Sequence, residues 1–574
     1  MRALTLVGLF VLSGCAEQRP RSAAEGLTKL QTSLQSPDAA ARAKAAWDLG
    51  QLGLAEIPEG APEPAVSISL REAAAAALIP VVFDPEAPVR RAAIEGLGKT
   101  GGATIEDTLI SAGTDVDAGV RGEVALALFR RRFLKRVPEY STASLNKLLT
   151  LAVDSNSEVR WRAIYAFTRF PDERAAKTLT QSVKDPDKVA RLFAVRSLSK
   201  LGRSVDVSLL SDPDIYVRAE AVAAFGAAKA AGELPSSVYG DVSAHVRAAA
   251  ADAVASTGDP ALAARLEKMA DTDSPMPRGR ALIALAKLRG GAEAPRLERA
   301  RKDARWWVRS KAYEASAFLP DSAAILNAGV ADPDARVAAQ ALETLAASTA
   351  PLAASAIESV LRDPKAQLEL IGTAIDAAAE RKSPTFAAAL QSAWARPDLT
   401  AEIRDSLRKA LKASGVVVKA GPGLDAPKTF APLTSSPILI LETEKGLVEI
   451  LLDAQAAPNT AAAIADTARR GVYDGTIWHR VVTAFVVQGA DPRGSGWGDD
   501  GFRLVDEVNR LPFVRGTLGM PKAGPDTGGC QLFVSLVPTP HLDGRYTAFG
   551  RVVSGMDVLD ALEPGDKILK AHLR

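Results

Sequence analysis

Small apolar residues recur at steps of three and four positions through most of the chain, which is the spacing of an apolar stripe on a helix. Each run follows a short polar phrase, Asp or Asp-Pro and then Val-Arg, as in Asp212-Pro213 with Val217-Arg218. From residue 160 onward the arginine of this phrase returns at intervals of 27 to 31 residues. It stands at Arg160, Arg191, Arg218, Arg247, Arg278 and Arg309. A period of about 30 residues predicts a stack of helix-turn-helix units.

Each part of the phrase has a structural explanation. We expect Asp to cap the second helix of the unit and Pro to fit its first turn. We expect the arginine to pair with an aspartate of its own or of the next repeat, and alanines at the contacts to let helices approach closely. Asp-Pro-Asp, at 185–187, 212–214 and 332–334, lacks the other oxygen ligands and the glycine of a calcium loop, so we interpret it as a cap.

The repeated pattern resembles the HEAT-type repeats of the short kind, in about ten to twelve copies over residues 25–412. The resemblance implies an all-α solenoid. Stacked repeats offer an extended surface, so we expect the solenoid to act as a scaffold that binds a protein partner.

The helical pattern stops near Val416. Glycines and prolines then mark a linker over residues 413–436. The apolar runs that begin at Ile438 and Leu447, separated by a Glu-Lys-Gly turn, predict a β-hairpin. An alanine-rich helix is expected from Asn459 to about residue 470, and further strands with glycine-rich loops follow. Residues 437–574 are therefore a second folded domain of another class.

The N-terminus predicts export. Residues 1–14 carry one positive charge at Arg2, a short apolar stretch and small residues, which is typical of a signal peptide and too short to span a bilayer. Leu12-Ser13-Gly14-Cys15 resembles a bacterial lipobox, which implies a lipid on Cys15; the alternative is an ordinary secretory signal with a chance cysteine. Residues 15–24 are a polar tether. We expect a lipid-anchored protein of the bacterial cell envelope, at the outer membrane facing the periplasm.

The amino-acid composition limits the classes of binding partner that we expect. The chain has 574 residues, 70 of them basic and 68 acidic, and residues 437–574 hold 14 basic against 17 acidic side chains. This balance removes the electrostatic footprint of a nucleic-acid binder, and no nucleic-acid partner is expected. Two cysteines exclude a disulfide scaffold. Only 30 residues are aromatic (16 Phe, 7 Trp and 7 Tyr), so the 47% apolar content is mostly small and aliphatic, as close helix packing requires.

Three ordered blocks of the second domain resemble the cyclophilin-type peptidyl-prolyl cis-trans isomerases. The first reads Gly471-Val-Tyr-Asp-Gly-Thr-Ile-Trp-His-Arg-Val-Val482 and continues as Phe485-Val-Val-Gln-Gly-Ala-Asp491. The second runs from Gly516 through Gly-Gly-Cys-Gln-Leu-Phe-Val534, and the third is Leu542-Asp-Gly-Arg-Tyr-Thr-Ala-Phe-Gly550. The resemblance implies a closed eight-stranded β-barrel capped by two helices, the second near residues 556–562. The whole chain is then a multidomain protein, an all-α HEAT-like solenoid followed by a cyclophilin-like barrel.

The resemblance also implies an enzyme that isomerises X–Pro bonds of client proteins and assigns its site, with no cofactor and no metal. Arg480 is the catalytic residue, because a cationic donor favours the twisted, pyramidal proline nitrogen over the planar amide. The residues implied for substrate binding are His479, Phe485, Val486, Gln488, Gln531, Phe533, Leu542 and Tyr546.

Some positions depart from the family pattern. Pro521-Lys522 stands where Ala-Asn normally binds the substrate backbone, and His541 stands where Trp or Phe is common. These departures leave open an alternative function, a weakly catalytic or non-catalytic scaffold whose barrel only binds Pro-containing segments. A glycine-rich segment, Gly494-Ser-Gly496-Trp-Gly498, is similar to a phosphate-binding loop. It lacks the following helix and the Lys of such a loop, so we interpret it as a loop of the barrel.

Overall fold

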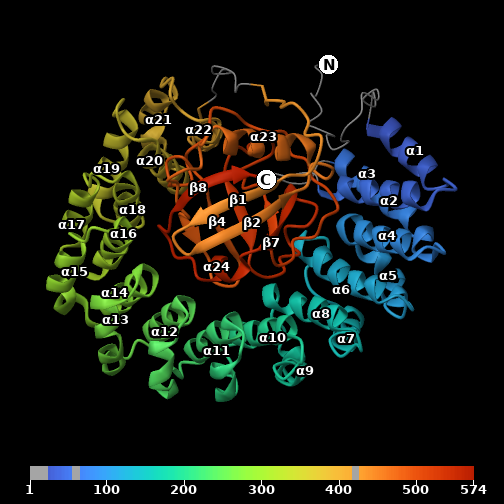
Figure 1. Cartoon of the computed structure of the whole chain (residues 1–574), viewed down its shortest axis with the longest axis horizontal. Helices are drawn as coiled ribbons and strands as arrows, with labels where there is room; N and C mark the ends of the chain where they lie inside the picture. Colours follow the sequence, from blue (N-terminus) through green and yellow to red (C-terminus); the bar gives the residue numbers. More distant parts are fainter. Residues whose placement is uncertain (1–22, 55–64, 417–425) are drawn as a thin grey trace. The chain divides into compact units, whose positions relative to one another are not determined.

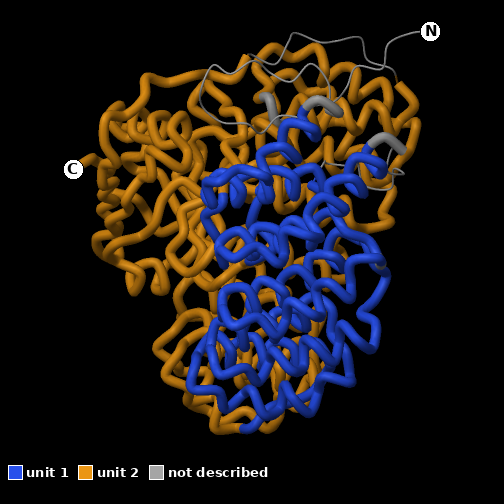
Figure 2. Tube along the Cα trace, turned by 90° about the vertical axis from the view of Figure 1, so that its right-hand side faces the viewer, with its two compact units in different colours: residues 1–206, 510–512, 540–545 blue, residues 207–509, 513–539, 546–574 orange. Residues whose placement is uncertain are grey.

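The computed structural model describes residues 23–54, 65–416 and 426–574, and these divide into two compact units (Figure 2). Unit 1 holds the described residues up to 206 together with 510–512 and 540–545. Unit 2 holds the remaining described residues from 207 to 574. The predicted signal peptide (1–14) and the lipobox cysteine Cys15 lie outside the described residues.

In the described part of the chain, helical pairs extend as far as residue 413, and within each unit the second helix of a pair packs on the second helix of the next (Figure 1). The second helices of unit 1 are α2 (Ala39–Gln51), α4 (Ala87–Thr100), α6 (Ala118–Phe133), α8 (Ser157–Arg169) and α10 (Lys188–Lys200). Those of unit 2 are α11 (Ile215–Ala227), α12 (Ala244–Thr257), α14 (Pro275–Arg289), α16 (Trp306–Ala315), α18 (Ala335–Ala346), α20 (Leu368–Arg381) and α22 (Ala401–Ala413). The predicted all-α repeat architecture is confirmed.

The first helices of the pairs are shorter on average. They are α1 (Ala23–Ser33), α3 (Ala65–Leu78), α5 (Glu106–Ala112), α7 (Thr142–Leu151), α9 (Ala176–Ser182), α13 (Glu267–Thr272), α15 (Ala294–Ala300), α17 (Ser322–Gly329), α19 (Pro351–Arg362) and α21 (Ala387–Trp394). Short 3₁₀ turns, Val207–Ser211 and Ser236–Gly240, stand before α11 and α12 instead. Among the helices of the described residues, none is long and apolar enough to cross a bilayer.

Small residues set the spacing between neighbouring second helices. A Cβ on Gly98 of α4 would lie 2.6 Å from the Cα of Ala127 on α6, and a Cβ on Gly226 of α11 would lie 2.7 Å from the Cα of Ala253 on α12. Real side chains do not approach a backbone that closely, so these positions require glycine against alanine. The alanine-rich composition is therefore a packing requirement of the stack.

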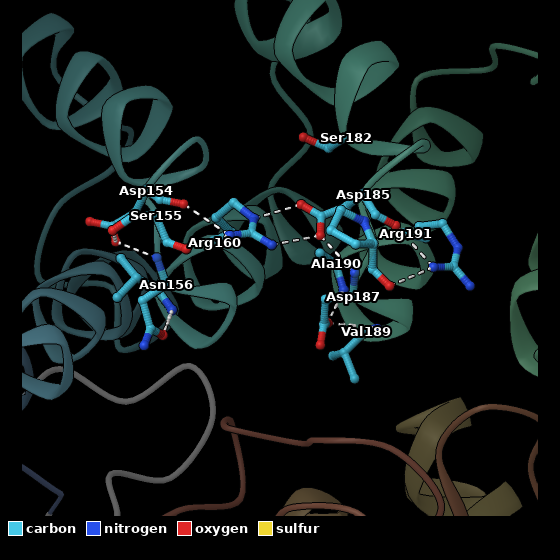
Figure 3. A network of polar contacts seen from close by, with 12 residues as sticks. Asp154, Ser155, Asn156, Arg160, Ser182, Asp185, Asp187, Val189, Ala190 and Arg191 are labelled. Atoms are coloured by element: carbon cyan, nitrogen blue, oxygen red, sulfur yellow. Dashed lines mark hydrogen bonds and ion pairs between the residues drawn. The ribbon is translucent and has the colours of Figure 1, made fainter.

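The repeated arginine pairs with the next repeat. Nε and Nη2 of Arg160 donate to the two carboxylate oxygens of Asp185 at 2.6 and 2.8 Å, while Nη1 donates to the carbonyls of Asp154 and Ser155 in its own loop (Figure 3). The Arg160 side chain is only 14% exposed. Among the described residues the same ion pair joins Arg42–Asp84, Arg90–Asp115 and Arg121–Asp154 in unit 1, and Arg218–Asp241, Arg247–Asp273, Arg278–Asp303 and Arg309–Asp332 in unit 2. The expected pairing is confirmed, and its partner is the next repeat.

The two aspartates of Asp-Pro-Asp have different partners. Asp187 is the N-cap of α10, and its carboxylate accepts the backbone N–H groups of Val189 and Ala190. Asp185 accepts the N–H of Asp187 together with the guanidinium of Arg160 (Figure 3). Pro186 consequently precedes the cap, so the prediction that Pro occupies the first helical turn was wrong. The second aspartate needs the N-cap position, and the proline is confined to the loop before it.

The C-terminal region forms an eight-stranded antiparallel sheet within the described part of unit 2, in the order β3-β4-β6-β5-β7-β2-β1-β8. The segment just before β3 is joined to the start of β8 and the residues before it, by backbone hydrogen bonds from Trp478 N to Asp566 O at 2.9 Å and from Ile568 N to Thr476 O at 2.8 Å. The sheet therefore closes, as the barrel prediction requires. The strands are β1 (Ile438–Thr443), β2 (Gly446–Leu452), β3 (Arg480–Val481), β4 (Val486–Gly489), β5 (Thr517–Gly519), β6 (Leu532–Ser535), β7 (Ala548–Ser554) and β8 (Ile568–Leu573). The two predicted helices are α23 (Pro458–Arg469) and α24 (Met556–Asp560).

Within unit 2, four of the second helices contact the C-terminal domain through one repeated position in the first turn. The second residue of the helix is Tyr216 in α11, His245 in α12, Met276 in α14 and Glu369 in α20. The Tyr216 hydroxyl donates to Asp560 at 2.7 Å, and Nδ1 of His245 lies 2.8 Å from the hydroxyl of Thr483. The Met276 N–H donates to Glu563 at 2.8 Å, and Glu369 accepts from Arg493 at 2.7 Å. Four repeats of this unit thus contribute the same helical position to one domain.

We expect Arg160→Met to lower the free energy of local unfolding of α8 and α10 by about 2 kcal/mol. The reason is that the substitution leaves the poorly exposed Asp185 without its cation. Hydrogen exchange of the full chain measures this as faster exchange of amides in the first turns of α8 and α10. The control is Arg203→Met, which breaks an exposed pair with Glu173 and should change stability by less than about 1 kcal/mol. Equal exchange in both variants would contradict a structural role for the ion-pair series.

Candidate active site

Three of the predicted site residues lie in one row across β3, β4 and β6. Arg480 is paired in register with Gln488, and Gln488 is paired with Phe533. Directly opposite residues of neighbouring strands project from the same face of a sheet, so these side chains share a face. Nη1 of Arg480 donates to Oε1 of Gln488 at 3.4 Å. The row continues on β5 at Gly519, where a Cβ would overlap the ring of Phe533.

Aromatic rings surround this row. The guanidinium carbon of Arg480 lies 5.8 Å from the centre of the Phe485 ring. The Phe533 ring stacks on Phe513 with centroids 5.5 Å apart, and Tyr546 meets Phe533 edge-on at 6.2 Å. Val486 is only 2% exposed and lies two residues from Gln488 on β4, on the same face. A cationic group therefore stands beside an apolar surface.

Arg480 keeps its charge in this setting. Its side chain is exposed, and desolvation by the surrounding protein lowers its pKa from the ordinary arginine value. Arginine nevertheless remains protonated in proteins at neutral pH. The guanidinium is therefore a permanent cationic donor.

Gln531 connects this row to a glycine-rich loop. Its Nε2 donates to the carbonyl oxygens of Gly496 and Gly498 at 2.9 and 3.1 Å, and its Oε1 accepts from Nε2 of Gln488 at 3.1 Å. The loop folds around the fully buried carboxylate of Asp491. That carboxylate accepts backbone N–H groups of Arg493, Ser495, Gly496 and Gly498. The interpretation of this segment as a barrel loop is confirmed.

His479 is a buried neutral group. Burial lowers its pKa to about 4; the nearby charges of Arg480 and Arg336 act in the same direction, and Asp491 opposes them. Within the described residues its Nδ1 has no hydrogen-bond partner. The imidazole is therefore uncharged at neutral pH and leaves Arg480 as the cation of the site.

Leu542 is buried, but it belongs to unit 1 with the segment 540–545, whereas the other predicted site residues belong to unit 2. In that segment His541 accepts or donates a hydrogen bond with Tyr165 of α8, Nδ1 to hydroxyl, at 2.7 Å. Burial lowers the pKa of His541 to about 3. The departure at this position thus makes a polar contact with a repeat helix of the same unit.

At the departure Pro521-Lys522, the lysine side chain is paired with neighbours in the same domain. Nζ of Lys522 pairs with Asp506 at 2.5 Å and lies 5.4 Å from the centre of the Tyr546 ring. The Lys522 side chain is only 9% exposed. Its ammonium is therefore neutralised by a neighbour and does not project freely.

Several residues that support the site were not singled out by sequence. They are Asp491, which organises the loop, and Gly519 and Phe513, which make room for and stack on Phe533. Asp491 and Gly519 lie within the sequence blocks that carry the family resemblance. The sequence therefore contained the information needed to single them out. The described residues contain no group of His, Cys, Asp and Glu side chains that could hold a metal ion.

Comparison with known proteins agrees with this geometry. Residues 438–571 match the family described as cyclophilin type peptidyl-prolyl cis-trans isomerase/CLD, and residues 145–211, 207–286 and 238–317 match HEAT repeats. A peptidyl-prolyl cis-trans isomerase of Synechococcus elongatus is 41% identical over 136 residues, covering 23% of this chain and 94% of that protein. The peptidyl-prolyl cis-trans isomerase-like 1 of Mus musculus is 41% identical over 162 residues, covering 25% of this chain and 95% of that protein.

Among solved structures, a cyclophilin type isomerase of Cryptosporidium parvum shares 26% identity, covers 24% of this chain and 98% of that chain, and has a TM-score of 0.24. By its match to the family model and its identity with these isomerases, the C-terminal domain is a peptidyl-prolyl cis-trans isomerase domain. Through residues 438–571 the chain belongs to the cyclophilin-type peptidyl-prolyl cis-trans isomerases, and it carries HEAT repeats in addition.

We expect His479 to titrate near pH 4 in the folded chain, because burial lowers its pKa. Unfolded histidine titrates near 6.5, so the stability that depends on neutral His479 is fully present above about pH 6.5 and is lost as the pH falls toward 4, by about 3 kcal/mol. NMR titration of the imidazole C–H signals in the full chain measures the midpoint, with His479→Asn assigning the signal. A midpoint at pH 6 or above would contradict the buried neutral state.

Proposed function

We propose that the chain is a lipid-anchored prolyl isomerase of the bacterial cell envelope, in which Arg480 is the catalytic residue and the repeat array holds client proteins. The row Arg480–Gln488–Phe533 supports the catalytic part of this proposal. The lipobox at Cys15 supports the anchor, and the extended surface of stacked repeats supports the scaffold role.

The chemistry follows from the peptide bond. Rotation about it crosses about 18–20 kcal/mol, because the nitrogen lone pair is delocalised into the carbonyl. At the twisted transition state the nitrogen becomes pyramidal and its lone pair becomes available to a donor. A fixed guanidinium stabilises that state more than the planar amide, which lowers the barrier.

The neighbouring residues have matching roles in this proposal. The rings of Phe485 and Phe533, with Val486, offer the apolar surface that a pyrrolidine ring requires, and Tyr546 meets Phe533 edge-on beside it. His479 is assigned to the substrate groove by family resemblance alone. Gln488 accepts a hydrogen bond from Arg480 and so limits the positions of the guanidinium. Gln488 and Gln531 also present amide groups for the backbone of a bound peptide, and Leu542 is assigned to the pocket by family resemblance alone.

We expect Arg480→Ala to lower kcat/KM for a Pro-containing peptide by roughly a hundredfold to a thousandfold, the usual cost of removing one transition-state donor. The assay uses the full chain and follows cis-to-trans conversion. Arg470→Ala is the matched control, since Arg470 is an exposed arginine of the same domain that pairs with Asp466 and Asp500. Unchanged turnover in Arg480→Ala would refute the assigned mechanism.

A second candidate function is a barrel that binds Pro-containing segments with little turnover. It is favoured by the rim at Pro521-Lys522, where the Lys522 ammonium pairs with Asp506 and no amide group is presented to a peptide. The same assay separates the two functions when peptide affinity is measured alongside it. Tight binding with negligible isomerisation by the unaltered chain supports the scaffold.

The anchor has its own test. We expect the unaltered chain, expressed in a Gram-negative host, to fractionate with membranes, because several acyl chains on Cys15 hold a protein durably in a bilayer. Cys15→Ser should move it to the soluble fraction. Cys530→Ser is the control, since Cys530 is a buried free thiol of the barrel and should not alter fractionation. Membrane association that persists in Cys15→Ser would contradict lipidation at this position.

A further inference from the structure

A carboxylate of the repeat array is buried against the loop that supports the isomerase site. Glu369 is the second residue of α20, and its side chain is 3% exposed. Its Oε1 and Oε2 accept from Nε and Nη2 of Arg493 at 2.7 and 3.0 Å, and its Oε1 also accepts from the Ser495 hydroxyl at 3.0 Å. Two parallel bonds to one guanidinium restrict orientation as well as distance.

The same face of α20 holds a second residue of this loop. Gly372 follows Glu369 by three positions, which places both on one side of the helix. A Cβ on Gly372 would lie 2.9 Å from the indole of Trp497, so the ring rests directly on the helix backbone. The loop from Asp491 to Gly498 is therefore held at both Arg493 and Trp497 by one turn of a repeat helix.

Glu369 is ionised in this position. Burial alone would raise the pKa of its carboxyl, but the hydrogen bonds from Arg493 and Ser495 outweigh burial and lower the pKa. The first turn of a helix also favours a negative charge. Arg493 therefore meets a full negative charge at neutral pH.

From this loop the contacts continue without a gap to Arg480. The carbonyls of Gly496 and Gly498 accept from Gln531, and Gln531 accepts from Gln488. Gln488 accepts in turn from the guanidinium of Arg480 at 3.4 Å. Each link is a hydrogen bond of a side-chain amide or guanidinium, which restricts the orientation of that group.

We propose that Glu369 is a positioning residue for prolyl isomerisation: by fixing the loop Asp491–Gly498 it orients Gln531 and Gln488 and, through them, the guanidinium of Arg480. This proposal rests on the proposed function, in which Arg480 is the catalytic donor. Its consequence is that the repeat array forms part of the enzyme and that the barrel does not act alone.

The test compares kcat and KM for a Pro-containing peptide in variants of the full chain. We expect Glu369→Ala to lower kcat about tenfold to a hundredfold with a smaller change in KM, because a misplaced catalytic group costs turnover more than ground-state binding. Glu369→Asp should restore part of the loss, since it keeps the charge. Arg493→Lys keeps the cation but loses the paired hydrogen bonds, and it should lower kcat in the same direction.

Tyr216→Phe is the matched control, because it removes another hydrogen bond between a second helix and the C-terminal domain, at Asp560, which lies outside this series of contacts. Its kcat should equal that of the unaltered chain. Hydrogen exchange of α20 and α22 in Glu369→Ala checks that the repeat itself remains folded.

The outcomes separate the two proposals. Wild-type kcat in both Glu369→Ala and Arg493→Lys, with Arg480→Ala impaired, overturns the positioning role and leaves the proposed function intact. A loss of kcat in Tyr216→Phe as large as in Glu369→Ala also overturns it, since any contact would then suffice. Full activity in Arg480→Ala removes the catalytic assignment and this inference together.

Discussion

The ion pair between a helix arginine and the loop aspartate of the next repeat is the interaction on which the repeat array depends. The arginine is the fourth residue of the second helix, as in Arg218 of α11 and Arg247 of α12, and its guanidinium also ties down the loop before its own helix. The second residue of the same helix points about 200° away around the helix axis. One helical turn in unit 2 is therefore fixed to its neighbour on one side and contacts the C-terminal domain on the other.

In the barrel the corresponding constraint is strand register. Because opposite residues share a face, a one-residue slip of β3 against β4 would carry Arg480 to the other face and separate it from Gln488. Gly519 fixes the next part of the row, since a side chain there would displace the Phe533 ring from Phe513. The donor and the aromatic surface are thus placed by backbone pairing, and the polar contacts of Gln488 and Gln531 adjust the position of the guanidinium within that frame.

Local signals in the sequence predicted the repeat architecture, while the resemblance to the cyclophilin family implied the barrel and the candidate site residues. The repeat phrase is short and periodic, and the row Arg480–Gln488–Phe533 comes from motifs whose residues are close together in the chain. The error at Pro186 arose because the phrase holds two aspartates and only one of them is the N-cap. The role of Glu369 could not be predicted, because its partner Arg493 is 124 residues away in the sequence. In addition, α20 lacks the arginine that marks the repeat in earlier helices. A polar residue at the start of an amphipathic helix carries no sign that it will be buried.

The Glu369–Arg493 pair contributes more to the position of the loop Asp491–Gly498 than to the stability of the fold. A buried ion pair contributes little net stability, because the cost of desolvating both charges offsets their attraction. Removing Arg493, in contrast, leaves the Glu369 carboxylate, whose side chain is 3% exposed, buried and unpaired, which costs about 3–5 kcal/mol. Such a pair therefore disfavours other positions of the loop Asp491–Gly498. It does so without adding much to the stability of the fold as a whole. This is the property that an isomerase site requires, since its rate depends on where one guanidinium stands relative to a nitrogen that becomes pyramidal only at the transition state.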